Sequence, residues 1–289
     1  MKMPLGIIIL FFSFSCVNAQ EETIASFGEG VPIATLKDNG LDEISGLAVS
    51  RVLPGVMYVH NDSGGEAAVY LLDTLGNNLG TIEFLDTQNR DWEDIAVGPG
   101  EDSKSYIYVG EIGDNNAVHD EVVVYRVPEP NDSNSTIGIV PQKTVLKYPG
   151  GARDAESLMV DPISGDIFIV SKRDSVNTLY RLPAEKFGTL EVELEELIKL
   201  PFTSATGADI SADGSQILVK NYLAIYYWRR NEGESIAQAM GRAPLELPYS
   251  PEPQGEAIGF GPDGRVFYTL SEKRFDVDPV LYKYTAKKP

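Results

Sequence analysis

The sequence predicts an all-β protein, a five-bladed β-propeller, from three observations. After residue 20 no long segment has helical periodicity, and short β-rich runs alternate with turns of Gly, Pro, Asp and Asn. A short motif recurs five times along the chain. Each copy is followed by a similar succession of strand-like runs. A six-bladed propeller is the alternative, but it requires a sixth copy of the motif that the sequence does not show.

The five motif copies begin at residues 43, 91, 154, 206 and 254, which are 48 to 63 residues apart. Successive copies read EISGLAV, DWEDIAV, DAESLMV, TGADISA and QGEAIGF. This spacing is the size of a four-stranded propeller blade, so each copy is expected to form the innermost strand of one blade.

The expected outer strands follow each motif in order. Second strands are predicted over 57–60, 106–109, 167–170, 216–219 and 266–270, and third strands over 67–72, 122–127, 178–182, 224–228 and 280–284. Fourth strands are predicted over 80–85, 143–148, 195–200 and 245–249. The fifth blade lacks a fourth strand, and we expect the N-terminal segment 32–37 to fill the gap and close the ring, which removes exposed sheet edges.

The N-terminus is typical of an export signal. Lys2 precedes an apolar run over 5–14 that is too short to span a bilayer. We therefore expect a signal peptide over 1–19, a linker over 20–31 and a single propeller domain over 32–289. Release near Gln20 predicts a periplasmic or secreted protein, whereas processing at Cys16, the single cysteine, would give a lipid-anchored one.

The composition limits the partners. A formal charge of −19 and a pI near 4.5 argue against nucleic acid and against an anionic membrane as the main partner. We expect a monomer without a transmembrane span, acting on a small-molecule or glycan substrate or binding a surface ligand. The excess of carboxylates favours a cation, or an anionic substrate held through one.

Polar residues gather at two positions that an antiparallel blade brings to the same face. These positions are the starts of the inner strands and the ends of the second strands, around the mouth of the central channel. The inner-strand candidates for metal ligands are Ser45, Glu93, Glu156, Ala208 and Glu256. The second-strand ends carry His60, Asn61, Asp62, Glu111, Asp114, Asn115, Lys172, Arg173, Lys220 and Glu272.

Carboxylates crowded in a channel of low dielectric constant must protonate, pair with bases or bind a cation. A Ca²⁺ ion suits them, since it takes six to eight oxygen ligands in flexible geometry. Two histidines and one cysteine argue against zinc or copper. The architectural alternative is that each acidic residue simply accepts backbone N–H bonds from the next blade.

The pattern of Ser45, Glu93, Glu156 and Glu256 resembles that of the calcium-activated nucleotidases (apyrases), as does the segment Asp91-Trp-Glu-Asp. The resemblance implies a five-bladed propeller with one Ca²⁺ near its axis, held by Ser and Glu residues. Ala208 departs from the pattern because only its carbonyl could serve, and His60-Asn61 replaces acidic residues. The motifs DWED, GEIGDN and GEAI also resemble those of a group of exported bacterial propellers without a settled activity.

Two functions compete, and the sequence leaves open whether the protein is an enzyme. The first is a Ca²⁺-dependent hydrolase of a phosphate ester or anhydride. Its phosphate ligands would be Lys172, Arg173 and Lys220, with Asn61, Asn115 and Glu272 nearby, and its catalytic residues would come from His60, Asp62, Glu111 and Asp114. The second is a non-catalytic binding propeller with a structural Ca²⁺; a glycan-cleaving carboxylate pair is a further variant. The basic residues Lys172, Arg173 and Lys220 discriminate between the two functions, because a structural Ca²⁺ site does not need them.

Overall fold

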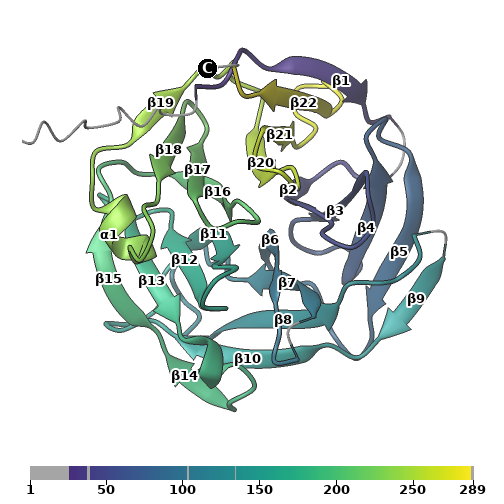
Figure 1. Cartoon of the computed structure of the whole chain (residues 1–289). Coiled ribbons are helices and arrows are strands. Elements are labelled where there is room, and N and C mark those ends of the chain that lie inside the picture. Colours follow the sequence, from purple (N-terminus) through teal and green to yellow (C-terminus); the bar gives the residue numbers. More distant parts are fainter. Residues whose placement is uncertain (1–25, 38–39, 103, 134, 288–289) are drawn as a thin grey trace, which may run out of the picture.

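The computed structural model describes residues 26–37, 40–102, 104–133 and 135–287, which form five β-sheets around a central channel (Figure 1). This arrangement confirms the predicted five-bladed propeller. The expected signal peptide, most of the expected linker and Cys16 lie outside the described residues.

Four strands form the antiparallel body of each blade, in order from the channel outward. Blade 1 contains β2 (Ile44–Val49), β3 (Val56–Asn61), β4 (Ala68–Asp73) and β5 (Asn78–Phe84). Blade 2 contains β6 (Trp92–Pro99), β7 (Ser105–Glu111), β8 (Val122–Pro128) and β10 (Gln142–Lys147). Blade 3 contains β11 (Ala155–Val160), β12 (Ile167–Ser171), β13 (Thr178–Leu182) and β15 (Glu195–Lys199). Blade 4 contains β16 (Ala205–Ile210), β17 (Gln216–Asn221), β18 (Ile225–Arg229) and β19 (Leu245–Leu247).

Blade 5 closes the ring as the sequence predicts. It contains β20 (Gly255–Phe260), β21 (Val266–Ser271) and β22 (Val280–Thr285), and β1 (Val31–Thr35) pairs antiparallel with β22 at its outer edge (Figure 1). Phe27 strengthens the closure, because its buried ring lies 4.9 Å from that of Phe267 between ring centroids. The N-terminal segment therefore links the two ends of the described chain.

Two short strands lie outside the predicted plan. The chain between β8 and β10 forms β9 (Thr136–Ile139), which pairs in parallel with β5 of blade 1. Between β13 and β15, η1 (Ala184–Lys186) leads into β14 (Glu191–Glu193), which pairs in parallel with β10 of blade 2. Each extra strand covers the edge of the preceding blade, and β9 accounts for the long second repeat. A helix, α1 (Ile236–Met240), lies between β18 and β19 and begins with a Ser235–Gln238 capping box.

The apolar core lies between neighbouring blades. Between blades 1 and 2, the ring of Trp92 packs 5.2 Å from Phe84 and 6.1 Å from Tyr125, measured between centroids. Between blades 3 and 4, Phe202 stacks on Tyr226 at 4.0 Å. These contacts fix the blades relative to one another and leave the inner strands to line the channel.

Candidate metal centre at the channel mouth

A β-bulge at the start of every inner strand aims one side chain at the channel mouth. In blade 3, Ala155 pairs with Ser171 and Ser157 with Val170, so Glu156 has no partner on β12. A bulge of this kind re-aims a side chain and is typical of functional sites. The same register shift occurs in all five blades, and the bulged residues are Ser45, Glu93, Glu156, Thr206 and Glu256.

The fourth member of this ring differs from the one expected. Ala205 pairs with Asn221 and Gly207 with Lys220, which leaves Thr206 at the bulge and places Ala208 two residues further into the channel. The fourth motif copy therefore starts at residue 204 rather than 206. A two-residue shift preserves the alternation of side chains between the two faces of a strand, so the apolar pattern alone could not detect it.

Carboxylates from blades 1, 2 and 3 converge in the mouth. Asp62, Asp91 and Glu93 each place an oxygen atom within 4.8 Å of the others, and Glu93, Asp154 and Glu156 do the same. Glu93 belongs to both groups, and it is 3% exposed. We call these five residues the acidic cluster. Asp91 and Asp154 belong to the repeated motif but were not among the expected ligands.

Burial and mutual repulsion raise the pKa values of Asp62, Asp91, Glu93 and Glu156. Burial, followed by the charge of Asp91, raises the pKa of Asp62 to about 7. Burial and the charge of Glu156 raise the pKa of Glu93 well above its ordinary value. The Oδ1 atom of Asp62 is buried and meets no hydrogen-bond donor in the described part of the chain. These carboxylates thus lack sufficient protein cations to balance their charge.

Lys172 neutralises the other side of the ring. Its ammonium forms an ion pair with Glu156 Oε2, lies 3.9 Å from Glu256 Oε1 and donates to the Tyr222 hydroxyl at 2.8 Å. Tyr222 in turn donates to Glu256 Oε1 at 2.7 Å. Burial favours the neutral amine, but the charges of Glu156 and Glu256 outweigh it and raise the pKa of Lys172. Tyr222 was missed because it lies beyond the end of a strand in a loop without a motif.

Glu272 extends this network to blade 5. Burial and the charge of Glu256 raise the pKa of Glu272 to about 9, so it is protonated at neutral pH. A protonated Glu272 can donate to Glu256, which explains how two buried carboxyls remain adjacent.

Arg173 stands at the rim of the acidic cluster. Its Nε lies 2.7 Å from Asp154 Oδ2, a second nitrogen donates to Asn115 Oδ1, and 52% of its side chain is exposed. Asp154 also accepts the backbone N–H of Asp114 at 2.8 Å. Arg173 and Asn115 therefore lie together, as the sequence predicts, with the guanidinium partly open to solvent.

Lys220 faces away from this cluster. It is fully buried, donates to the Gly255 carbonyl and lies 3.8 Å from Glu252 Oε2. Glu252 also accepts bonds from Thr269 at 2.7 Å and Tyr249 at 3.0 Å. Burial lowers the pKa of Lys220 to about 8. The lysine serves an internal ion pair between blades 4 and 5, unlike the phosphate contact that the sequence suggested.

Two expected general bases hold loop backbone. Asp114 accepts the N–H groups of Val118 at 3.0 Å and His119 at 2.7 Å, and these bonds outweigh the effect of burial and lower the pKa of Asp114. Glu111 accepts the N–H of Arg90 at 3.3 Å, and burial raises the pKa of Glu111. Neither carboxylate is directed at the acidic cluster by these bonds.

The segment before Asp62 is held by amides. His60 is fully buried with Nδ1 3.0 Å from the Asn61 carbonyl, and burial lowers its pKa to about 4, so it is neutral. Asn61 donates to the Gly40 carbonyl at 2.8 Å. Asn89, which no motif of the sequence marks, donates to the carbonyls of Asn61 and Asp62 and accepts the Trp92 N–H at 3.1 Å. Asn89 thus fixes Asp62 relative to Glu93.

Deeper in the channel, two aspartates act architecturally. Asp94 accepts the N–H groups of Ile95 at 2.9 Å, Leu158 at 2.7 Å and Ala208 at 3.2 Å, which belong to blades 2, 3 and 4. Asp209 accepts the N–H of Phe260 in blade 5 at 2.7 Å. The architectural alternative therefore holds for these two aspartates, which lie one and three residues beyond the bulges of their strands. Ala208 takes part in this network by donating its backbone N–H to Asp94.

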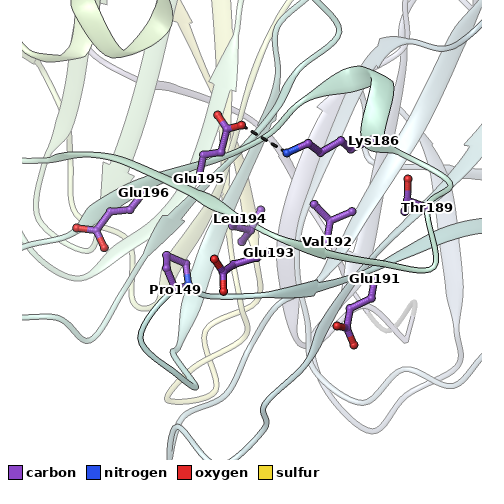
Figure 2. A pocket seen from close by; sticks show the side chains of 9 residues that line it. All are labelled: Pro149, Lys186, Thr189, Glu191, Val192, Glu193, Leu194, Glu195 and Glu196. Carbon is purple, nitrogen blue, oxygen red and sulfur yellow. Dashed lines mark ion pairs between the residues drawn. The ribbon is translucent and has the colours of Figure 1, made fainter.

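A second acidic region lies outside the mouth. A groove with a volume of about 760 Å³ runs along β14 and β15 and is lined by Glu191, Glu193, Glu195 and Glu196. Figure 2 shows the side chains that line it. Lys186 pairs with Glu195 at 3.6 Å, and Lys147 pairs with Glu191 at 2.8 Å. This groove at the edge of the sheets has its own lysines and is separate from the acidic cluster.

Comparisons with known proteins support the fold alone. No family model and no curated protein matches the chain. A solved structure titled as the PQQ-bound aldose sugar dehydrogenase of Streptomyces coelicolor has a TM-score of 0.53 and 13% identity over 91% of this chain and 99% of that one. A gluconolactonase, XC5397 of Xanthomonas campestris, has a TM-score of 0.48 and 11% identity over 84% of this chain and 72% of its own. A chain of a nidogen/laminin complex has a TM-score of 0.48 and 16% identity, over 79% of this chain and 72% of its own. Identity this low indicates nothing about activity.

Proposed function

We propose that this protein is an exported Ca²⁺-binding propeller that hydrolyses a phosphate ester or anhydride at the channel mouth. The observation that carries the proposal is the convergence of Asp62, Asp91 and Glu93, whose oxygens lie within 4.8 Å of one another. Three carboxylates at this distance must hold protons or bind a cation, and the Asp62 Oδ1 atom, which has no donor in the described chain, is free to join a cation.

The donor set fits Ca²⁺. It consists of carboxylate oxygens: Asp62 lies on a short loop, Asp91 lies two residues before the bulge of β6, and Glu93 lies at that bulge. Such a set of oxygen ligands suits a hard ion with flexible geometry. His60 is buried and turned toward the Asn61 carbonyl, so no imidazole joins the cluster from that strand. We assign Asp62, Asp91, Glu93 and Asp154 as the ligands, with Glu156 and Glu256 held by Lys172 beside them.

The surrounding residues supply the rest of the chemistry. When bound, Ca²⁺ would act as a Lewis acid on a phosphate oxygen. Arg173, half exposed and fixed by Asp154, is placed to bind a second phosphate oxygen through its guanidinium. Asp62 has a pKa of about 7 in the metal-free protein; a bound Ca²⁺ would favour the carboxylate and lower that pKa, so Asp62 serves as a ligand and not as the general base.

A second function keeps a specific observation in its favour. Lys172 and Lys220, two of the three expected phosphate ligands, are buried in internal ion pairs. A non-catalytic propeller with a structural Ca²⁺ needs no phosphate ligands, and this arrangement suits it.

The inverting form of the glycan-cleaving variant requires carboxylates about 6.5–9.5 Å apart, whereas the clustered oxygens lie within 4.8 Å.

Export is part of the proposal and rests on the sequence of residues 1–19. No helix among the described residues has the length and apolarity needed to cross a membrane. Retention of a lipid on Cys16, as opposed to release after residue 19, is decided by the mass of the mature N-terminal peptide.

The experiment combines Ca²⁺ binding with hydrolysis. Purified protein is titrated with Ca²⁺ by calorimetry and then assayed with p-nitrophenyl phosphate, pyrophosphate and ATP, in Ca²⁺ or in chelator. We expect hydrolysis that depends on Ca²⁺ and is lost in Glu93→Gln, while Glu193→Gln in the outer groove behaves as wild type. Ca²⁺ binding without hydrolysis of any substrate would favour the non-catalytic function, and the absence of Ca²⁺ binding would refute both.

A further inference from the structure

A second cleft lies on the face opposite the mouth, between blades 2 and 3. Its volume is about 620 Å³, which is within the range of small-molecule sites, about 300–1,000 Å³. The turn from β6 to β7, the turn from β11 to β12 and the segment around η1 line it. The proposed chemistry at the mouth uses none of these residues.

A buried arginine forms part of the wall of this cleft. The Arg126 side chain is 4% exposed, and its guanidinium lies 4.1 Å from the ring centroid of Phe187 and 4.9 Å from that of Tyr106. Nε donates to Gln142 Oε1 at 3.1 Å. Nη2 donates to the same Gln142 oxygen at 2.6 Å and to Glu101 Oε1 at 2.8 Å, so the plane of the guanidinium is fixed and Nη2 is shared between Gln142 and Glu101.

The anion that balances Arg126 is exposed. Glu101 Oε1 lies 2.8 Å from Nη2, but 73% of the Glu101 side chain is accessible to solvent. A buried guanidinium needs an anionic partner, whereas an exposed carboxylate on a turn loses little when another carboxylate replaces it. Glu101 therefore holds a position that an external carboxylate can take.

Part of the wall beside this position is apolar, although Ser164 and Glu185 also line the cleft. Pro162 and Ile163 approach from the β11–β12 turn, Ala184 and Phe187 come from the segment around η1, and Ile163 is 69% exposed. An apolar group next to the carboxylate would cover this surface, and burial of such a group is favourable. A ligand that matches a guanidinium on one side of the cleft and apolar side chains on the other is an amphipathic anion.

We propose that this cleft binds a small planar carboxylate, which replaces Glu101 on Arg126 and lays its apolar body against Ile163 and Phe187. Neither the Ca²⁺ site nor the hydrolytic function is required for this binding. A simple inorganic anion shares the charge but not the apolar body, so the two kinds of ligand are distinguishable by affinity.

The test uses benzoate as the probe, with acetate and phosphate as comparisons, on the full mature protein. We expect benzoate to bind with a dissociation constant of about 1 mM or less. Acetate and phosphate should bind at least about tenfold more weakly. The Glu101→Ala variant removes the competing carboxylate and should tighten benzoate binding by about fivefold. Glu185→Ala, in the same cleft but without a contact to Arg126, is the matched control.

The outcomes separate this proposal from the one for the mouth. Benzoate affinity should be equal in Ca²⁺ and in chelator, because the cleft and the acidic cluster lie on opposite faces. An Arg126→Gln variant that retains its fold should lose binding. The proposal fails if benzoate does not bind, if Glu101→Ala binds no more tightly than Glu185→Ala, or if phosphate binds as well as benzoate.

Discussion

Substituting Asp62 by Asn should remove a pH-dependent contribution to the melting temperature that crowding in the acidic cluster creates. In the folded protein the pKa of Asp62 is about 7, compared with an ordinary value of 3.8. Because the folded value is the higher one, the folded state binds more protons between these limits. The stability from protonated Asp62 is therefore complete below the ordinary pKa and is lost as the pH rises through 7.

Wild-type protein alone would hide this loss. His60 has a folded pKa of about 4 against an ordinary 6.5, so its contribution to stability rises with pH over the same range. The difference between wild type and Asp62→Asn cancels the His60 contribution and isolates Asp62. Between about pH 5 and pH 8, the difference in free energy of unfolding between wild type and Asp62→Asn should change by about 2–3 kcal/mol, after a discount for the partial exposure of the carboxyl.

The assay is thermal unfolding by calorimetry in chelator, at several values between these limits. For a chain of this size the change corresponds to about 4–6 °C in relative melting temperature, with wild type the less stable protein at the higher pH. Saturating Ca²⁺ should reverse the order, because the variant lacks a ligand. Asp263→Asn, at an exposed turn on the opposite face, should show no such trend. A difference that is constant with pH in chelator would refute the pKa assignment and the crowding behind it.

Three further predictions concern neighbouring parts of the channel. Lys172→Met leaves Glu156 and Glu256 without their cation, so in chelator it should cost about 3–5 kcal/mol of stability and Ca²⁺ should restore part of it; an unchanged melting curve would contradict the ion pair. Gly113→Ala places a methyl group against the carboxylates of Glu93 and Asp91, so Ca²⁺ titration should show weaker binding although no ligand is removed. Asp94→Asn leaves at least one of three buried N–H groups without an acceptor, at a cost of about 2–4 kcal/mol, and hydrogen exchange at Leu158 and Ala208 should accelerate.

The blade plan was predictable because it depends on local patterns that repeat. Turn residues and β-rich runs marked the four-stranded meanders, and the missing fourth strand in blade 5 led directly to the pairing of β1 with β22. The strands β9 and β14 were not predictable in the same way. Each is three or four residues long and pairs with a blade other than its own, so its stability comes from an edge that is distant in sequence.

The site was only partly predictable, since the sequence shows which residues are polar but not which charges meet. Asp62, Glu93, Glu156 and Lys172 lie in the mouth as expected. Lys220 lies two residues earlier in its strand than Lys172 does, since Asn221 pairs with Ala205 as Ser171 pairs with Ala155. Its ammonium contacts Glu252, a residue with no place in the motif. Asn89 and Tyr222 connect the site from loops, where no repeat marks them.

The distribution of charge within the mouth decides which half of the ring can bind a cation. Lys172 lies between Glu156 and Glu256, and Glu272 is protonated beside Glu256 at neutral pH, so blades 3 to 5 have little uncompensated negative charge. Within the described residues Asp62, Asp91 and Glu93 share no such lysine; the charge of Arg90 acts on Asp91, and Arg173 is paired with Asp154. A ring that looks symmetric in the sequence is therefore electrostatically one-sided: the carboxylates without a lysine lie on blades 1 and 2, where we propose the cation site with Asp154 of blade 3 as a further ligand, and Arg173 lies at its edge.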